Sequence, residues 1–422
     1  MNEDHVALLT KMFDAAIKAA DPLASLKAHL PDKPKGRTVV IGAGKGAAQM
    51  AAAFEQLWGD PVTGAIVTRY GYAVACKHVK VLEASHPVPD EAGLAATSAL
   101  FEAVEGLGPE DLVVALICGG GSSLLPAPPE GLTLSDEQAL NEALLASGAP
   151  IGAMNAIRKH CSRIKGGRLA QAAYPARVVS LVVSDVPGDD PAQVASGPTV
   201  PDDVTLEDAL SLIESLRIDW PEAIKTHLAK ESARAPDPSD DGFARSSVTV
   251  VASAGMSLDA AAAVGRDAGY SVSILSDAIE GEARDIGLMH AALAKQVADK
   301  NAPFKKPSIL LSGGETTVTL RAKGRGGRNT EFLLSFAQAI EGMHGISALA
   351  ADTDGIDGSE DNAGAFADGQ SAVRMRAGGV DPRVALSGND AWGAFDAAGD
   401  LFVPGPTGTN VNDLRAIIIE DV

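Results

Sequence analysis

The fold is decided by the stretch Thr38-Val39-Val40-Ile41-Gly42-Ala43-Gly44-Lys45-Gly46-Ala47, in which an apolar strand pattern passes into a glycine-rich turn. A strand that ends in closely spaced glycines and opens a helix presents backbone N–H groups and the positive end of a helix dipole. Lys45 adds a full positive charge at this turn. The stretch therefore predicts the first strand of an α/β domain, followed by a turn that binds a phosphate or a carboxylate.

Short apolar runs alternate with alanine-rich helical patterns after this turn. The runs lie at 65–67, 79–82, 112–118 and 178–183, and the helical patterns include 49–57 and 93–104. This alternation is typical of a parallel sheet that helices cover on both faces. A longer helical pattern at 152–174 carries the densest basic patch of the chain.

A second α/β unit is predicted beyond a linker at 231–246, which is rich in Pro, Asp and Ser. We place the boundary near residue 240, between domains of residues 1–240 and 241–422. Strand patterns follow at 248–252, 271–275, 308–311, 316–321 and 346–350, with helical patterns at 257–268, 282–297 and 330–340. The run at 316–321 closely follows another strand, so antiparallel pairing there would make this sheet mixed.

Composition and charge restrict the classes of function. The 422 residues are 46% hydrophobic and carry a formal net charge of −20, which argues against nucleic acid or an acidic membrane as partner. An anionic ligand must therefore meet a local basic cluster. Cys76, Cys118 and Cys161 form no C-x-x-C pair, so neither a disulfide framework nor a zinc site is supported. The N-terminus does not resemble a signal peptide and no apolar run reaches membrane length, so we expect a cytoplasmic protein.

The first glycine turn admits more than one interpretation. Residues 42–47 match the dinucleotide fingerprint G-x-G-x-x-A, but the acidic residue expected about 20 positions later is absent near Arg69. Arg69 itself would remain compatible with NADP. The turn is not a Walker A loop, because no hydroxyl residue follows Lys45. The alternative without function is a tight turn whose lysine only points to solvent.

A second glycine turn, Gly119-Gly120-Gly121-Ser122-Ser123, follows the most apolar strand pattern. Consecutive glycines let the backbone approach a ligand closely, and the two serines add hydroxyl donors, as expected of a cradle for phosphate or carboxylate. The alternative is a flexible turn. The sequence has no G-x-S-x-G elbow, which argues against a serine hydrolase.

Acidic loops follow two further strands, at 184–190 and 352–358. Their carboxylates beside a phosphate would suit Mg²⁺, whereas Asx turns and helix caps are the alternative for each single aspartate. A turn at 323–331 brings three cations to the start of a helix. Arginine forks on such turns clamp charge during phosphoryl transfer, and a solvated basic hairpin is the alternative. His86, in a proline-rich loop, is expected to orient substrate or support the loop rather than to catalyse.

These motifs together resemble the class II glycerate kinases, the glycerate 2-kinase family with a MOFRL C-terminal domain, some of whose members are labelled hydroxypyruvate reductase. The resemblance spans nearly the whole chain in order and is carried by Gly42-Ala43-Gly44-Lys45, Ser85-His86-Pro87-Val88-Pro89-Asp90, Gly119-Gly120-Gly121-Ser122-Ser123, Lys165-Gly166-Gly167-Arg168, Ser184-Asp185-Val186-Pro187-Gly188-Asp189, Ser196-Gly197-Pro198-Thr199, Ser312-Gly313-Gly314-Glu315-Thr316, Gly326-Gly327-Arg328-Asn329 and Asp352-Thr353-Asp354-Gly355-Ile356-Asp357-Gly358.

The resemblance implies an N-terminal Rossmann-like α/β/α sandwich, a C-terminal MOFRL-type α/β domain with a mixed sheet, and an active site in the interdomain cleft. It implies transfer of the γ-phosphoryl group of ATP, with Mg²⁺, to the 2-hydroxyl of D-glycerate. Hydroxypyruvate reduction with NAD(P)H is the alternative activity, and a non-catalytic sugar-acid binding protein is a third class. We expect a monomer or a homodimer without nucleic-acid or membrane partners.

The resemblance, read with the chemistry of the loops, also implies residue roles. Lys45 and Arg328 would stabilise the transferring phosphoryl group, with Arg325 the alternative to Arg328, and Asp189 would activate the glycerate hydroxyl, with Asp185 its alternative. Substrate or nucleotide would be bound by Gly42, Gly44, His86, Gly119, Gly120, Gly121, Ser122, Ser123, Asp185, Ser196, Glu315 and Arg325, and Mg²⁺ by Asp352, Asp354 and Asp357.

Overall fold

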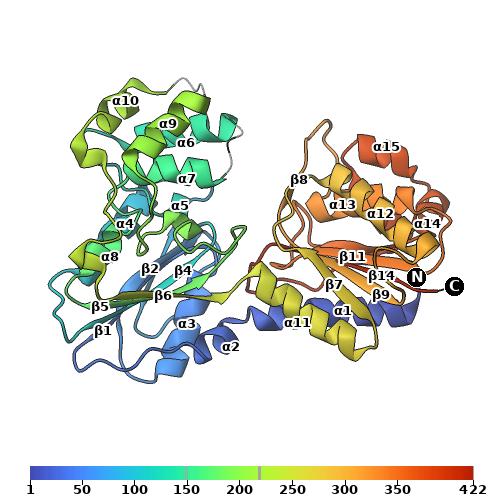
Figure 1. Cartoon of the computed structure of the whole chain (residues 1–422), viewed down its shortest axis with the longest axis horizontal. Coiled ribbons are helices and arrows are strands. Elements are labelled where there is room, and N and C mark those ends of the chain that lie inside the picture. Colours follow the sequence, from blue (N-terminus) through green and yellow to red (C-terminus); the bar gives the residue numbers. More distant parts are fainter. Residues whose placement is uncertain (148, 150, 217–219, 422) are drawn as a thin grey trace. The chain divides into compact units, whose positions relative to one another are not determined.

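The chain forms two compact units in the computed structural model, which describes residues 1–147, 149, 151–216 and 220–421 (Figure 1). One unit comprises residues 22–251, and the other combines residues 1–21 with residues 252–422. Each unit contains its own six-stranded sheet. The predicted two-domain α/β class is therefore confirmed.

The first unit is built on a sheet with the strand order β3-β2-β1-β4-β5-β6, which is the order of a Rossmann fold. The pairs from β3 to β5 are all parallel. The elements of this unit are α2 (Pro22–Lys27), β1 (Thr38–Ala43), α3 (Ala47–Trp58), β2 (Thr63–Arg69), β3 (Lys80–Ala84), α4 (Glu91–Val104), β4 (Leu112–Cys118), α5 (Gly121–Leu124), α6 (Leu134–Ala146), α7 (Ile151–His160), α8 (Arg168–Ala173), β5 (Arg177–Val183), α9 (Leu206–Leu216), α10 (Glu222–Leu228) and β6 (Ser246–Ala252), with short 3₁₀ turns η1 (Val194–Ser196), η2 (Glu231–Ala233) and η3 (Asp241–Phe243).

The two central strands β1 and β4 are buried along their whole length, which explains their continuous apolar sequences. Helix α3 lies on one face of this sheet, and α4 and α8 lie on the other (Figure 1). Helices α6, α7, α9 and α10 share a smaller core of their own around residues such as Leu144, Ile157 and Ile224. The sheet thus holds β1 and β4 side by side, so the turns that follow these two strands also lie side by side.

The basic patch predicted at 152–174 is not one helix, and its two lysines are engaged in ion pairs. The chain breaks between α7 and α8 at two glycines with left-handed backbones. Lys159 is buried and pairs with Asp202, and the buried Lys165 donates to Glu137 over 2.8 Å. The charges of these two lysines are satisfied inside the unit, so their ammonium groups belong to internal ion pairs rather than to a ligand surface.

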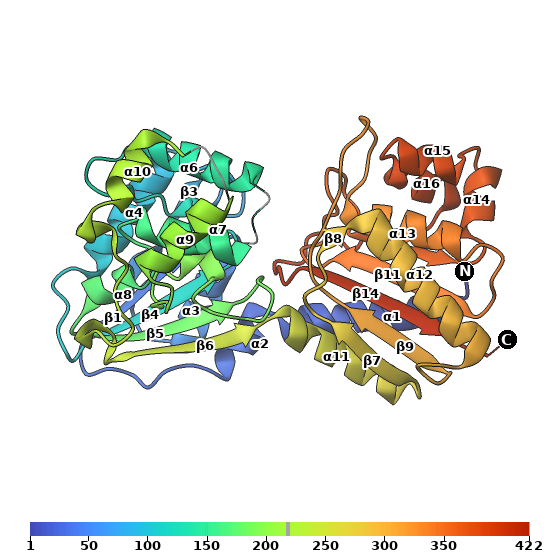
Figure 2. The same cartoon turned by 45° about the horizontal axis from the view of Figure 1, so that its top comes forward.

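The second unit contains a mixed sheet in the order β13-β12-β11-β14-β9-β7, with one parallel pair, β7 with β9, beside antiparallel pairs. Helices α1 and α11 pack on one face and α12 and α13 on the other (Figure 2). The elements are α1 (Glu3–Ala19), α11 (Ala254–Asp267), β7 (Ser271–Ser276), β8 (Gly281–Glu282), α12 (Ala283–Lys300), β9 (Ser308–Ser312), β10 (Thr316–Thr317), α13 (Arg328–Ala339), β11 (Ile346–Asp352), β12 (Gly364–Asp368), α14 (Ser371–Ala377), α15 (Pro382–Ser387), α16 (Ala391–Ala398), β13 (Leu401–Phe402) and β14 (Asp413–Ile419).

The structure divides the chain differently from the predicted boundary near residue 240. Strand β6, predicted as the first strand of the second domain, is the edge strand of the first sheet. Helix α1, predicted in domain 1–240, buries Leu9, Met12 and Phe13 against the second sheet. The amphipathic pattern of α1 shows which face is buried but not which sheet covers it.

The mixed character of the second sheet was predicted for the wrong reason. The run at 316–321 contributes only the two-residue strand β10, which pairs in parallel with β8 outside the main sheet. The antiparallel pairs come instead from β12, β13 and β14, which lie beyond the predicted strands. Within the described residues, no helix is long and apolar enough to cross a bilayer.

Candidate active site

Two glycine-rich turns leave the sheet of the first unit side by side. Strands β1 and β4 are parallel neighbours in register from Thr38 opposite Leu112 to Ala43 opposite Ile117. The strand order reverses direction between these two strands, which is where ligands bind in open α/β sheets. The backbone N–H of Lys45 donates to the carbonyl oxygen of Gly119 over 2.9 Å. The predicted turns therefore form one structure, which we call the switch-point site.

The first turn does not offer the open set of backbone donors that its sequence predicted. The N–H of Gly44 donates to Val67 and that of Gly46 to the sulfur of Cys118 over 3.1 Å. Gly44 has a left-handed φ of +134°, and an added Cβ there would collide with the backbone of Cys118. Gly42 lies buried within β1. The glycines of this turn thus permit close packing, and the side chain of Lys45 is the positive charge that the turn carries.

The second turn brings Lys45 and His86 to the same glycine. Gly120 has a left-handed φ of +78°, and a Cβ added there would lie 3.1 Å from both the Cγ of Lys45 and the Nε2 of His86. Within the described residues, the backbone N–H groups of Gly120, Gly121 and Ser122 find no protein acceptor. The start of the turn at 119–123 therefore presents free backbone donors, as a helix N-terminus does.

Three basic side chains gather around these turns. Arg69 ends β2 and is paired in register with Ala84, so it lies beside the loop that carries His86. Burial, together with the positive charges of Lys45 and Arg69, lowers the pKa of His86 to about 4. His86 is therefore neutral at pH 7. In the part of the chain that the structure describes, none of the three side chains pairs with a carboxylate.

A chain of hydrogen bonds holds Ser122 of the second turn. The hydroxyls of Ser122 and Ser196 lie 2.8 Å apart, and Ser196 donates to the Oδ1 of Asn155 over 3.0 Å. The backbones of Ala195 and Ser196 are left-handed, with φ of 53° and 59°. Such strain in non-glycine residues is concentrated at functional sites. Asn155 was not predicted, because a lone asparagine in a helix has no sequence motif.

The two candidate bases occupy different places. Asp185 lies against the second turn, since a Cβ added to Gly119 would collide with its carboxylate. Asp189 lies farther along the loop that follows β5, with a left-handed φ of 53°. The structure therefore brings Asp185 to the switch-point site, whereas no contact joins Asp189 to it among the described residues.

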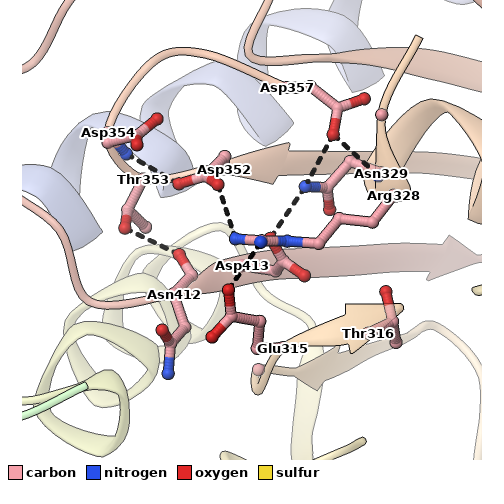
Figure 3. Close-up of polar contacts among 12 residues, drawn as sticks. Glu315, Thr316, Arg328, Asn329, Asp352, Thr353, Asp354, Asp357, Asn412 and Asp413 are labelled. Atoms are coloured by element: carbon pink, nitrogen blue, oxygen red, sulfur yellow. Dashed lines mark hydrogen bonds and ion pairs between the residues drawn. The ribbon is translucent and has the colours of Figure 1, made fainter. Parts of the chain in front are cut away.

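The second unit carries a separate charged cluster around Arg328, at the start of α13 (Figure 3). Its Nε donates to Asp413 over 2.8 Å, its Nη1 to Glu315 over 2.6 Å and its Nη2 to Asp352 over 2.6 Å. Burial lowers the pKa of Arg328, but the charges of Asp413, Asp352 and Glu315 raise it to a greater extent. These three bonds use three of the five N–H donors of a guanidinium.

Two of the carboxylates around Arg328 are buried and one is exposed. The side chains of Asp413 and Asp352 are 0% and 7% exposed, whereas that of Glu315 is 55% exposed. Asp413 also accepts from the fully buried Arg415 over 2.6 Å. Arg415 and Asp413 were not predicted as site residues. The sequence does not reveal this ion pair, because charged residues in a strand are normally expected to be exposed.

The three aspartates predicted as magnesium ligands have separate tasks. Asp357 is buried and accepts from the backbone N–H groups of Asn329 and Thr330 over 2.9 and 2.8 Å, so it caps helix α13. Asp352 accepts from Arg328, and burial raises the pKa of both Asp352 and Asp357. Within the described residues, no group of three or more His, Cys, Asp or Glu side chains is placed so that it could hold a metal ion. The predicted three-aspartate site is therefore not formed.

Arg325, the alternative to Arg328, lies on the exposed part of its turn. Its guanidinium stacks 4.0 Å from the ring centre of Trp392, and its backbone N–H donates to Asp390 over 3.3 Å. Stacking on tryptophan holds an arginine without burying it. Arg325 makes no contact with the carboxylates around Arg328 in the described part of the chain, so the two arginines belong to different surroundings.

Comparison with known proteins places the chain in a family. Residues 8–229 match a domain of unknown function, DUF4147, and residues 308–413 match the MOFRL family. An Agrobacterium vitis protein named "Putative hydroxypyruvate reductase" is 53% identical over 98% of this chain and 94% of its own length. The D-glycerate 2-kinase of Thermotoga maritima is 39% identical over 96% of each chain.

A solved structure agrees with these sequence matches. The crystal structure of glycerate kinase from Thermotoga maritima aligns with a TM-score of 0.89 at 38% identity, over 99% of this chain and 100% of that chain. The chain therefore belongs to the family of two-domain glycerate 2-kinases, in which a DUF4147 domain precedes a MOFRL domain.

Proposed function

We propose that this protein is a glycerate 2-kinase, which transfers the γ-phosphoryl group of ATP to the 2-hydroxyl of D-glycerate. The observation that carries the proposal is the switch-point site, where Lys45 and His86 meet beside Gly120 and the charge of Arg69 acts on His86, with no acidic partner for any of the three among the described residues. A protein of net charge −20 would otherwise repel two anionic substrates. The full-length similarity to D-glycerate 2-kinase supports the same activity.

The reaction requires positioning and charge neutralisation more than covalent help. A bond forms between the 2-oxygen of glycerate and the γ-phosphorus, while the bond from that phosphorus to the β,γ-bridging oxygen breaks and ADP leaves. The hydroxyl proton passes to a carboxylate, for which Asp189 remains the proposal and Asp185 the alternative. The ammonium of Lys45 and the backbone N–H groups of 120–122 would stabilise the charge on the transferred group.

Arg328 remains a proposed catalytic residue with a restricted role. Three of its donors are engaged by carboxylates, so it offers a phosphoryl oxygen at most two N–H groups unless an existing bond opens. The exposed Glu315 is the partner that can leave at least cost, because an exposed ion pair contributes little. Binding of ligand between the two domains remains a prediction.

Magnesium is proposed as the companion of ATP. When bound it neutralises phosphate charge, and it commonly takes one or two carboxylates while phosphates and water fill its other positions. Asp354 fits this requirement better than Asp352 or Asp357, because its Oδ1 accepts only a local bond from Ile356 over 2.8 Å. Its carboxylate is neither paired with Arg328 nor used to cap α13.

The name of the Agrobacterium relative keeps hydroxypyruvate reduction as a second candidate. A nicotinamide dinucleotide at the first turn would need a ribose-binding group at the end of β2. That position holds Arg69 rather than an acid. NADH binding is thus disfavoured, and only an NADP-type contact would be compatible with this residue.

One assay separates the two activities. The purified chain is incubated with D-glycerate, ATP and Mg²⁺, and the phosphorylated product is identified by ³¹P NMR while ADP is measured. In parallel it is given hydroxypyruvate with NADH or NADPH. We expect ADP and 2-phosphoglycerate in equal amounts. Nicotinamide oxidation without ADP release would overturn the kinase proposal, and ligand binding without any turnover would indicate a binding protein.

The cellular location and the oligomeric state are two further proposals. A cytoplasmic location is a proposal that agrees with three free cysteines, of which Cys118 and Cys161 are buried. Size-exclusion chromatography with light scattering distinguishes the predicted monomer from the predicted homodimer. Substrate and nucleotide are the expected small-molecule partners.

A further inference from the structure

We infer that Arg69 and His86 form the subsite that binds the carboxylate and a hydroxyl of the acceptor acid, with Arg69 the residue that selects acids over neutral polyols. This inference rests on the proposed kinase function and assigns a specificity role to Arg69, which belongs to none of the predicted binding residues. It follows from where Arg69 lies, what holds it and what surrounds it.

The position of Arg69 is set by the sheet. It is the last residue of β2, the strand next to β1, and its backbone is in register with Ala84 at the end of β3. His86 lies two residues beyond Ala84, and its Nε2 faces the same Gly120 position as the stem of Lys45. Arg69 therefore lies at the carboxyl edge of the sheet, on the flank of the switch-point site away from β4.

The guanidinium of Arg69 is held flat without being neutralised. Its Cζ lies 4.4 Å from the ring centre of Tyr72, which covers one face of the group. Stacking restrains the plane of a guanidinium but leaves the N–H donors on its edge available. Since no carboxylate pairs with it among the described residues, the edge is a preorganised, half-buried fork for a planar anion.

The neighbouring His86 is suited to bind a hydroxyl of a hydroxy acid rather than a second anionic group beside the carboxylate. Its imidazole is neutral at pH 7, so it can donate one hydrogen bond and accept another. A hydroxyl matches both roles, whereas a phosphate oxygen only accepts. The arginine fork matches a carboxylate through two parallel bonds, and the point charge of Lys45 suits a phosphoryl group.

The test uses the full chain with Arg69→Gln, Arg69→Lys and the control Arg245→Gln, which replaces an exposed arginine of the same unit whose guanidinium donates to the carbonyl oxygen of Pro175. We expect Arg69→Gln to raise the KM for D-glycerate about 10- to 100-fold and to leave the KM for ATP within about threefold, because a charge-assisted fork is lost. Arg69→Lys should fall in between, and Arg245→Gln should match the wild type.

Discrimination provides the second measurement. The kcat/KM ratio for D-glycerate over glycerol, which lacks the carboxylate, should collapse in Arg69→Gln. A rise in the KM for ATP with no change for D-glycerate would overturn the inference, because Arg69 would then contact the nucleotide. An unchanged D-glycerate to glycerol ratio would overturn it as well.

A binding experiment tests the subsite independently of the proposed kinase activity. Calorimetric titration of wild type and Arg69→Gln with D-glycerate, D-lactate and inorganic phosphate needs no turnover. Carboxylate binding that depends on Arg69 would support the subsite even if no kinase activity were found. Phosphate binding that depends on Arg69, or equal carboxylate binding by both proteins, would refute it. Circular dichroism of each variant shows that it is folded.

Discussion

The backbone N–H of Lys45 donates to the carbonyl oxygen of Gly119 over 2.9 Å, and this bond links the turns that leave two neighbouring strands. The main chain of Lys45, not its side chain, therefore helps to hold the two turns together. The carbonyl oxygen of Lys45 is also fixed, since it accepts from the hydroxyl of Thr68 over 3.1 Å. The ammonium can consequently be removed without dismantling the site.

Replacement of Lys45 by methionine tests this separation of roles. The variant keeps the length of the side chain and both backbone bonds but loses the charge. We expect kcat for glycerate phosphorylation to fall about 10²- to 10³-fold, the usual consequence of losing one donor to the transition state. The melting temperature should match that of Lys77→Met, a control at an exposed lysine of the same unit. Near-normal turnover would show that Lys45 is not catalytic.

The hydroxyl of Ser196 is expected to act through Ser122. Ser196→Ala removes the link between Ser122 and Asn155 and leaves a buried acceptor with one donor fewer, at a cost of about 1–3 kcal/mol. We expect both lower stability and a kcat/KM reduced about tenfold, since Ser122 loses its fixed orientation. Ser98→Ala, at an exposed position of helix α4, is the control. A loss of stability with unchanged kinetics would limit this chain of hydrogen bonds to a structural role.

The sequence predicts those strands whose own residues show a clear local pattern, and it misses strands whose burial depends on distant parts of the chain. Strand β4 was predicted with its observed bounds, because seven consecutive apolar residues are buried on both faces. Strand β12, with the sequence Gly-Ala-Phe-Ala-Asp, lacks β-branched residues and was missed. Strand β14 is central in the second sheet but begins with the buried pair Asp413 and Arg415, which read as surface residues.

The candidate site shows the same limit. The glycine turns and Lys45 were predicted from local motifs, and the sheet confirmed that the turns lie together. The role of Asp357 could not be predicted, because its partners lie almost thirty residues earlier in the chain. The Asp-x-Asp-Gly-x-Asp-Gly pattern describes the loop but not the helix end that it contacts. Long-range partners of this kind decide whether an aspartate binds metal or caps a helix.

The titration of His86 gives a pH prediction with a definite sign. Its pKa in the folded protein is about 4, below the usual value of 6.5, so the unfolded chain binds more protons between these values. The contribution of His86 to the stability of the folded protein therefore falls as the pH is lowered from 6.5 to 4. His86→Gln should lack this part of the loss, as calorimetric unfolding at several pH values would show. The NMR resonance of wild type that is missing in His86→Gln should titrate near pH 4, and a midpoint near 6.5 would contradict the burial argument.

The carboxylates around Arg328 provide a matched pair of variants. Asp413→Asn weakens bonds to Arg328 and to the fully buried Arg415, so we expect a loss of about 3–5 kcal/mol, as for one broken partner of a buried ion pair. Glu315→Gln changes an exposed partner and should cost less than about 1 kcal/mol. Urea unfolding of both variants measures the difference. Equal losses would show that Glu315 is as much a part of the buried network as Asp413.

Asp357→Asn decides between a helix cap and a metal ligand. The carboxylate accepts from the backbone N–H groups of Asn329 and Thr330 and from the hydroxyl of Thr330, and an amide would turn an NH₂ group toward one of these donors. We expect a loss of about 2–3 kcal/mol and faster hydrogen exchange in the first turn of α13. Asp381→Asn, at the exposed cap of α15, is the control and should affect stability less. Where the variant is still folded, its rate of glycerate phosphorylation should depend on the Mg²⁺ concentration as that of the wild type does. The reason is that protein donors enclose the carboxylate of Asp357. A weaker response to Mg²⁺ with unchanged stability and exchange would restore Asp357 as a metal ligand.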